Sequence, residues 1–202
     1  MRAIGYSGGH PPTTGDTLSD NTFSRSLNDI GLAAWFGGTL ANAVALNPAA
    51  AEADSSSGVG SVANTGWDRW TPVNAAAIGA TLVGSTGLLI ANRGRVAGQS
   101  GVAGAAMLKT GLVVAALGVT AYSRVLGKRV SEHTAVPAHS GTEPAAATPP
   151  AVADAQRQLH LLQWVVPALT GAIIVVDAKL GEQQRPANVI EGIAARIPGL
   201  SG

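Results

Sequence analysis

The chain has 202 residues, of which 46% are hydrophobic and only 12% are charged, and its mean hydropathy is positive. A soluble domain carries about 25% charged residues, and a formal net charge of +1 lacks the basic excess that nucleic-acid binding uses. The absence of cysteine excludes disulfides, thiolate metal sites, c-type haem attachment and cysteine nucleophiles. This composition indicates an integral membrane protein without a nucleic-acid partner.

The first 24 residues are rich in Gly, Ser, Thr and Pro, so we expect residues 1–24 to form an irregular N-terminal tail. Four apolar runs follow, at residues 27–46, 71–92, 104–126 and 158–180. Each has about the 20 residues with which an α-helix crosses a hydrocarbon core. The first run is the least apolar, but it exceeds a signal-peptide core and a polar stretch precedes it. The predicted fold class is an all-α membrane protein, a four-transmembrane-helix bundle within residues 25–180.

The segments that connect these runs are polar. Residues 47–70 hold two acidic residues and a serine run, and residues 93–103 form a short basic loop. Residues 127–157 are low in complexity, and their Pro and Ala content favours an extended, poorly packed loop. Residues 181–202 form a C-terminal tail in which NVIEGIAARI predicts one short interfacial helix.

The distribution of basic residues favours one orientation. Four crossings place both termini on one side, together with Arg2, Arg25, Arg93, Arg95, Lys179, Arg185 and Arg196. The opposite side has fewer: Arg69, Lys128, Arg129 and Arg157, with Arg124 near the edge. Cytoplasmic segments carry the excess of Lys and Arg, so we expect both termini on the cytoplasmic side.

Most polar residues of each run share one helical face, because their spacing is three or four. We predict that these four faces turn toward one another and away from lipid. They contain Asn28, Trp35, Thr39 and Asn42 in the first run; Asn74, Thr81, Ser85 and Asn92 in the second; Lys109, Ala116, Thr120 and Ser123 in the third; and His160, Gln163, Pro167, Thr170, Ile174 and Asp177 in the fourth.

Three charged residues fall at similar depth: Asp29 early in the first run, Lys109 early in the third and Asp177 late in the fourth. An acid at the centre of a span costs about 2.5–3.5 kcal/mol on insertion scales, and less near its end. We predict that Lys109 pairs with Asp177, Asp29 or both, and that the pairing fixes helix rotation. The alternative is that Asp177 meets water at its helix end while Lys109 snorkels. The predicted structural polar network consists of Asp29, Lys109, Asp177, Asn74 and Thr170.

Two further features bear on helix packing. Pro167 removes a backbone hydrogen bond near the centre of its run, where Thr170 or Gln163 can compensate. A static kink is favoured over a hinge. Pairs of small residues four apart allow close helix approach, although a chain this rich in Ala and Gly generates such pairs by chance. They are Ala80 with Gly84, Gly111 with Ala115, and Ala168 with Ala172.

No segment carries a catalytic or ligand-binding signature. His160 is the one histidine in a run, so a haem with two histidine ligands lacks its second ligand. His133 and His139, with Glu132, lie in the low-complexity loop, where a solvated linker is favoured over a metal site. No serine has a neighbouring base and acid. We therefore expect no catalytic, cofactor-binding or metal-binding residue, and no enzyme activity.

Three segments, SLNDIGLAAWFGGTLANAVALNPAA, WDRWTPVNAAAIGATLVGSTGLL and LLQWVVPALTGAIIVVDAKLGEQQRP, together resemble a family of small actinobacterial, including mycobacterial, membrane proteins. One member of that family is an accessory subunit of the respiratory supercomplex that joins cytochrome bcc to the cytochrome aa3-type oxidase. The resemblance implies a multi-pass protein of the cell membrane that holds no cofactor. Its implied partners are lipids and the integral subunits of cytochrome bcc and cytochrome aa3 oxidase.

The function expected from residues and resemblance together is that of a non-catalytic accessory or assembly subunit, acting by helix packing and tail docking. The alternative is a small ion or proton channel or transporter with a polar bundle interior. Ion paths need ionisable groups spaced through the membrane. Here those groups lie near the two surfaces, with hydroxyls and amides between them.

Overall fold

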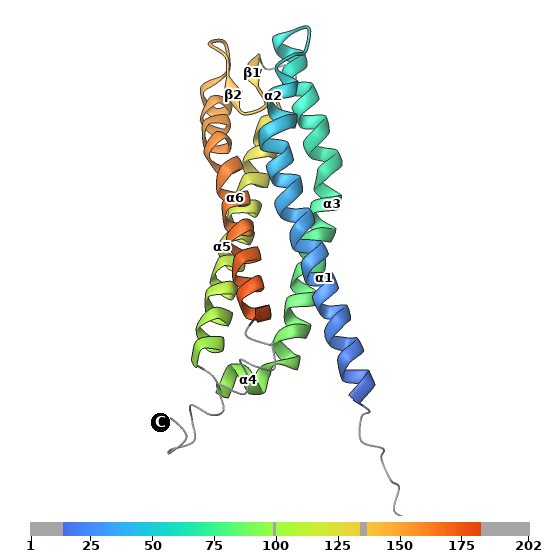
Figure 1. Ribbon diagram of the computed structural model, residues 1–202. Coiled ribbons are helices and arrows are strands. Elements are labelled where there is room, and N and C mark those ends of the chain that lie inside the picture. The colour runs from blue at the N-terminus through green and yellow to red at the C-terminus, as the bar shows by residue number, and fades with distance from the viewer. Residues whose placement is uncertain (1–13, 99, 134–136, 183–202) are drawn as a thin grey trace, which may run out of the picture.

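The computed structural model describes residues 14–98, 100–133 and 137–182, and Figure 1 shows its elements. In chain order these are the helix α1 (Thr14–Ala41), the π-helix η1 (Asn42–Leu46), the helices α2 (Asn47–Ala50), α3 (Ser56–Ala91), α4 (Arg93–Gly98) and α5 (Ser100–Ser131), the strands β1 (Ala138–Ser140) and β2 (Glu143–Pro144), and the helix α6 (Pro150–Glu182).

The prediction of four helices of membrane-spanning length is confirmed within the described residues. Four helices there are long and apolar enough to cross a membrane: Asn21–Ala50, Ser56–Ala91, Gly101–Ser131 and Pro150–Glu182. The first of these joins α1, η1 and α2 into one continuous helix. Each helix is longer than its predicted run, because helical structure continues into the polar segments, at both ends in three of the helices and only before the run in Ser56–Ala91.

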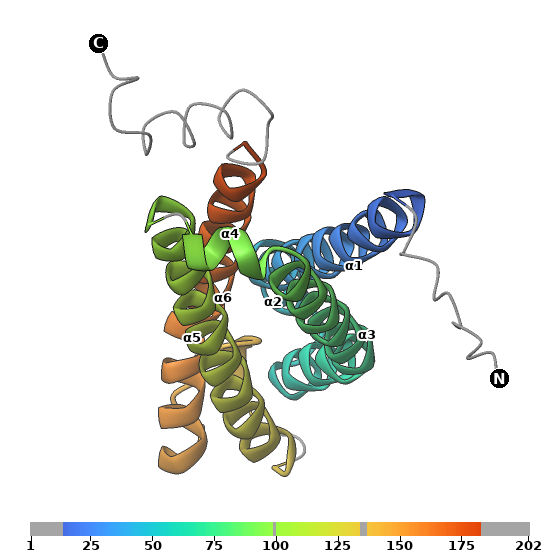
Figure 2. The same cartoon turned by 90° about the horizontal axis from the view of Figure 1, so that it is seen from below.

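The helices alternate in direction and form two tight pairs. α1 packs along α3, α5 packs along α6, and the pairs meet where α1 contacts α6. By contrast, α3 and α5 make little contact, although the short α4 connects them (Figure 2). α4, the start of α1 and the end of α6 lie at one end, and the antiparallel β1–β2 ribbon lies at the other (Figure 1). We call these the α4 end and the ribbon end.

Two glycines allow the backbones of α1 and α3 to approach closely. A Cβ atom on Gly31 would lie 2.5 Å from the carbonyl oxygen of Ala77 and 2.7 Å from the nitrogen of Thr81. A Cβ atom on Gly84 would overlap the backbone of Ser24 and Asn28. Gly84 belongs to a predicted small-residue pair, whereas Gly111, from another such pair, faces open space. The spacing of small residues therefore predicted one close approach of two helices, at Gly84, and gave one match by chance, at Gly111.

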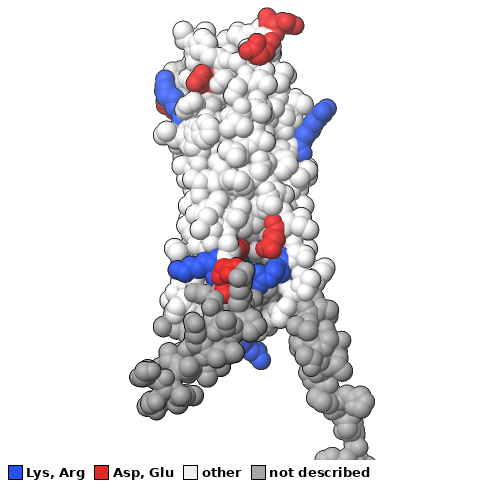
Figure 3. Space-filling model, viewed as in Figure 1, with Lys and Arg blue, Asp and Glu red and all other residues white. Residues whose placement is uncertain are grey.

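Burial in this bundle is inverted relative to a soluble protein. The polar face predicted for the first run is buried throughout, whereas large apolar side chains such as Ile30, Met107 and Val175 are about 70% exposed. On the face shown in Figure 3, Lys, Arg, Asp and Glu lie at two levels separated by an uncharged belt. The other three faces turn inward for most of their length, but Ile174 and His160 of the fourth are exposed. This arrangement suits a bundle surrounded by hydrocarbon.

The segment expected as a loop at residues 47–70 is helical from Ser56 onward. Ser55 is the N-cap of α3, since its Oγ accepts a hydrogen bond from the Gly58 nitrogen at 3.1 Å. Serine is among the preferred N-cap residues because it satisfies a free N–H of the first turn. The serine run therefore marks the start of a helix within the expected loop.

The loop expected at residues 127–157 is also more ordered than its composition suggests. α5 continues to Ser131, α6 begins at Pro150, and the β1–β2 ribbon lies between them. Ala138 of the ribbon is buried against Ala50, Val59 and Ala63. The ribbon therefore covers the junction of α2 and α3.

The two predicted tails are described only in part. The expected irregular tail, 1–24, is helical from Thr14, where α1 begins. Residues 1–13 lie outside the described residues, and so does the predicted interfacial helix at NVIEGIAARI.

We predict that Gly84→Ala destabilises the bundle although alanine is the better helix former. Overpacking costs about 1–3 kcal/mol, and a clash with backbone exceeds the gain of about 1 kcal/mol that alanine brings to a helix. The matched control is Gly79→Ala on the same helix, where nothing lies within 4 Å of the added Cβ. Thermal unfolding in detergent should show a lower Tm for Gly84→Ala alone. Equal Tm values would contradict a close α1–α3 contact.

Candidate functional site

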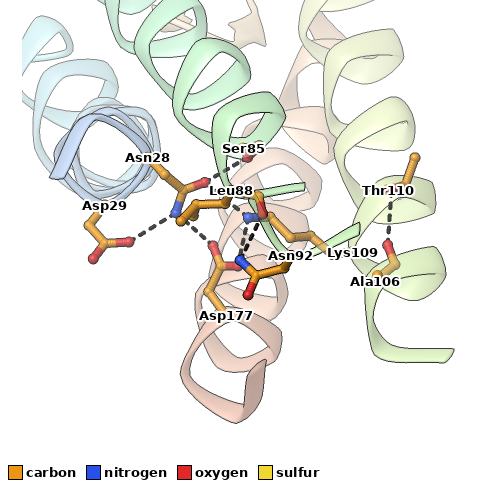
Figure 4. Close-up of polar contacts among 9 residues, drawn as sticks. All are labelled: Asn28, Asp29, Ser85, Leu88, Asn92, Ala106, Lys109, Thr110 and Asp177. Atoms are coloured by element: carbon orange, nitrogen blue, oxygen red, sulfur yellow. Dashed lines mark hydrogen bonds and ion pairs between the residues drawn. The ribbon is translucent and has the colours of Figure 1, made fainter. Parts of the chain in front are cut away.

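All four long helices contribute polar side chains to one cluster near the α4 end (Figure 4). α1 supplies Asn28 and Asp29, α3 supplies Ser85, α5 supplies Lys109 and α6 supplies Asp177. We call these five residues the polar centre. It connects segments that lie far apart in sequence, so it constrains all four helices at once.

Asn28 is the hub of the polar centre and is fully buried. Its Nδ2 group donates to Asp29 Oδ1 and to Asp177 Oδ2, both at 2.9 Å. Its Oδ1 accepts from Ser85 Oγ at 2.6 Å and from Lys109 Nζ at 2.9 Å. An asparagine side chain has two donor hydrogens and an oxygen with two lone pairs. Asn28 therefore uses its full hydrogen-bonding capacity, as a buried polar group requires.

Lys109 and Asp177 form an ion pair across α5 and α6. The distance from Lys109 Nζ to Asp177 Oδ1 is 2.6 Å, and the two side chains are 11% and 15% exposed. This is one of the pairings expected from the sequence, and this burial does not fit an Asp177 that meets water at its helix end. Asp29 joins the cluster through Asn28. A buried ion pair is stable only when hydrogen bonds satisfy its remaining atoms, which is what Asn28 provides to both partners.

Two residues of the predicted network lie elsewhere. Thr170 is buried, but its hydroxyl donates to the carbonyl oxygens of Val166 at 2.9 Å and Pro167 at 3.3 Å. It therefore supports the backbone of α6 beside the proline, not the polar centre. Asn74 lies nearer the ribbon end, where its Oδ1 is buried without a hydrogen-bond partner among the described residues.

A second polar cluster lies toward the ribbon end. Asn47 Nδ2 donates to Gln163 Oε1 at 2.9 Å, and Trp67 Nε1 donates to Asn47 Oδ1 at 3.1 Å. Sequence reasoning placed Asn47 in a loop and missed this cluster. The π-helix explains the error, because α-helical spacing would turn Asn47 about 140° away from the buried Asn42. The wider turn of the π-helix keeps Asn42 and Asn47 on the inner face of the bundle. Pro48 is the sequence signal that could have indicated the π-helix, because proline disrupts α-helical hydrogen bonding.

An apolar layer separates the two clusters. It is built from Leu32, Trp35, Ala77, Val113, Ala116, Val166 and Ile173. The buried hydroxyls near it, on Thr39, Thr81 and Thr170, each donate to a carbonyl of their own helix. At about 1.5 Å per residue, Asn28 and Asn47 lie roughly 28 Å apart along their helix. That separation is close to the thickness of a hydrocarbon core.

The histidines interact with nearby protein groups. His160 Nδ1 lies 3.3 Å from Thr142 Oγ1 and 3.9 Å from Glu143 Oε1, and His133 Nδ1 lies 3.0 Å from the Arg129 carbonyl oxygen. Among the residues that the structure describes, no three His, Asp or Glu side chains gather in a way that could hold a metal ion.

The chemistry of the polar centre is that of a network that stabilises a helix arrangement, since opposite charges and amide groups satisfy one another inside it. Comparison with known proteins adds no identity: no family model, curated protein or solved structure matches the chain.

We predict that Lys109→Met lowers the free energy of unfolding by about 3 kcal/mol, because it leaves Asp177 buried without its cation. The double variant Lys109→Met/Asp177→Leu should lose much less than the sum of the two single variants, since no unpaired charge remains. Lys128→Met, at an exposed position on the same helix, is the control. The free energy of unfolding in mixed micelles is measured for Lys109→Met, Asp177→Leu, the double variant and Lys128→Met. A Lys109→Met variant as stable as Lys128→Met would contradict a structural role for the pair.

Proposed function

We propose that this chain is a non-catalytic accessory or assembly subunit of a membrane-bound respiratory supercomplex and acts through helix packing. The observation that carries the proposal is the polar centre, in which Asn28 satisfies groups from every long helix. Such a network fixes one arrangement of helices and presents a rigid apolar exterior. A rigid exterior suits a protein whose role is to pack against other subunits within the membrane.

In this proposal the chain is a multi-pass protein of the cell membrane with both termini in the cytoplasm. The start of α1 and the end of α6 share the α4 end (Figure 1). Arg93 of α4 and Lys179 near the end of α6 contribute to the basic excess expected on a cytoplasmic side.

The apolar layer favours this proposal over a channel or transporter. An ion conducted through the centre of the bundle would have to pass side chains such as Trp35, Ala116 and Ile173, which are fully buried against one another. Ion pathways are lined by ionisable groups or by water-filled space. The hydroxyls nearest this layer are already donated to helix carbonyls.

The respiratory assignment rests on the three segments that resemble an accessory subunit of the cytochrome bcc–cytochrome aa3 supercomplex. Those segments include four of the five residues of the polar centre, namely Asn28, Asp29, Ser85 and Asp177. The proposed partners are therefore integral subunits of cytochrome bcc and of the aa3-type oxidase.

We predict that the tagged full-length chain, purified from its native membrane in mild detergent, brings haem-bearing subunits with it in fixed stoichiometry. Mass spectrometry identifies these proteins, and a reduced-minus-oxidised spectrum detects their haems. An unrelated four-helix membrane protein with the same tag and expression level is the control. Purification of the chain alone, together with ion flux from liposomes that contain it, would overturn the proposal in favour of conduction.

A further inference from the structure

Residues of α3 and α5 line a crevice where these two helices make little contact. Its ribbon-end half holds a cavity of about 320 Å³, and its α4-end half holds one of about 300 Å³. Leu117 lines both cavities, so they are neighbours along one crevice. These volumes are at the lower end of the range for small-molecule sites.

Polar atoms without partners gather around the ribbon-end cavity. Within the described residues, seven buried side-chain nitrogen and oxygen atoms lack a hydrogen-bond partner. Four of them belong to residues that line this one cavity: Trp70 Nε1, Asn74 Oδ1, Thr120 Oγ1 and Ser123 Oγ. A buried polar group without a partner is unfavourable, and each instance calls for an explanation.

The hydroxyl of Thr120 differs from those of other threonines in the long helices. Five of those threonines donate to the carbonyl four residues earlier in their own helix: Thr39, Thr71, Thr81, Thr110 and Thr170. Thr120 and Ser123 make no such bond among the described contacts. Both hydroxyls are enclosed by protein atoms, so an occupant of the cavity reaches them only after a change of side-chain rotamer.

The lining of the cavity changes from charged to apolar along the bundle. Toward the ribbon end it includes Arg124, which lies 3.2 Å from Asp68 in a partly exposed ion pair, together with Trp67 and Trp70. Toward the middle of the bundle it is lined by apolar residues such as Ile78. Tryptophan is enriched where a membrane meets water. A charged edge, a hydrogen-bonding zone and an apolar interior follow the order of groups in a membrane lipid.

We infer that this crevice binds one phosphoglycerolipid. Its phosphate lies at Arg124, and its ester oxygens accept hydrogen bonds from Trp70, Thr120 and Ser123. One acyl chain continues past Leu117 into the second cavity, which is lined by Leu82, Leu89 and Val114 and also by Lys109 and Asp177 of the polar centre. If the crevice held only water, its apolar walls would be in contact with water, which is unfavourable.

The inference rests on the proposed membrane location and is independent of any protein partner. It is tested on the isolated full-length chain in mild detergent. Native mass spectrometry counts retained phospholipid, and then measures rebinding of 1-palmitoyl-2-oleoyl-phosphatidylglycerol after delipidation. The diacylglycerol with the same chains, which lacks the phosphate, is a second probe.

We expect the wild-type chain to retain one phospholipid. Thr120→Val/Ser123→Ala should weaken rebinding about tenfold, as expected for two lost hydrogen bonds. Thr65→Val is the control, because Thr65 is exposed on α3 and lines neither cavity. Arg124→Gln should remove the preference for phosphatidylglycerol over diacylglycerol. If the double variant melts below the wild type before lipid is added, Thr120→Val alone replaces it.

Two results would overturn the inference. One is a wild-type chain that retains and rebinds no lipid. The other is a double variant that binds as tightly as Thr65→Val, which would show that lipid binds elsewhere. Neither result bears on whether haem-bearing subunits copurify, so failure of this inference and failure of the proposed function are distinguishable. Flotation of the chain with liposomes tests the membrane location separately.

Discussion

The fold depends on satisfying one buried amide, that of Asn28, together with the charges that meet it. Its two donor hydrogens bind carboxylates, and its oxygen binds an ammonium group and a hydroxyl. Because these partners come from different helices, rotation of any one helix would break a bond that hydrocarbon cannot replace. The close α1–α3 contact serves the same network. Gly84 lets its helix approach the Asn28 backbone, and the neighbouring Ser85 then reaches the Asn28 side chain.

The uneven pairing of helices follows from where these contacts lie. The continuous helix formed by α1, η1 and α2 carries the hub of the polar centre near one end and Asn47 of the second polar cluster near the other, so α3 and α6 pack against it. α5 is held chiefly by α6, to which Lys109 is bound through Asp177. α3 and α5 are consecutive long helices, yet each has its main partner elsewhere. The crevice between them is therefore a consequence of the same constraint that makes the rest of the bundle tight.

The length of the apolar runs was enough to predict the four long helices, and helical periodicity predicted most of their inward polar faces. Depth and face together predicted a pairing of Lys109 with Asp177, Asp29 or both, because depth and face follow from residue number. Periodicity did not single out Asn28, since spacing shows that several polar residues share a face but not which one can reach four partners. Asn47 was missed because the π-helix brings it onto the buried face, where α-helical spacing does not place it. The ribbon was missed because composition cannot show that Ala138 meets Ala50, Val59 and Ala63.

The two polar regions of the bundle have different physical consequences. At the polar centre the hub has all its hydrogen bonds made within the chain, so a ligand there would have to displace bonds that hold the helices together. Beside the ribbon-end cavity, four buried polar atoms lack partners within the described residues, and three of them are donors from which the ester oxygens of a lipid can accept. The polar contacts of the lipid and the polar centre thus lie on opposite sides of the apolar layer, whereas the acyl chain reaches a cavity that Lys109 and Asp177 also line. A bound lipid would fill the loosely packed side of the bundle and leave the arrangement fixed by Asn28 unchanged.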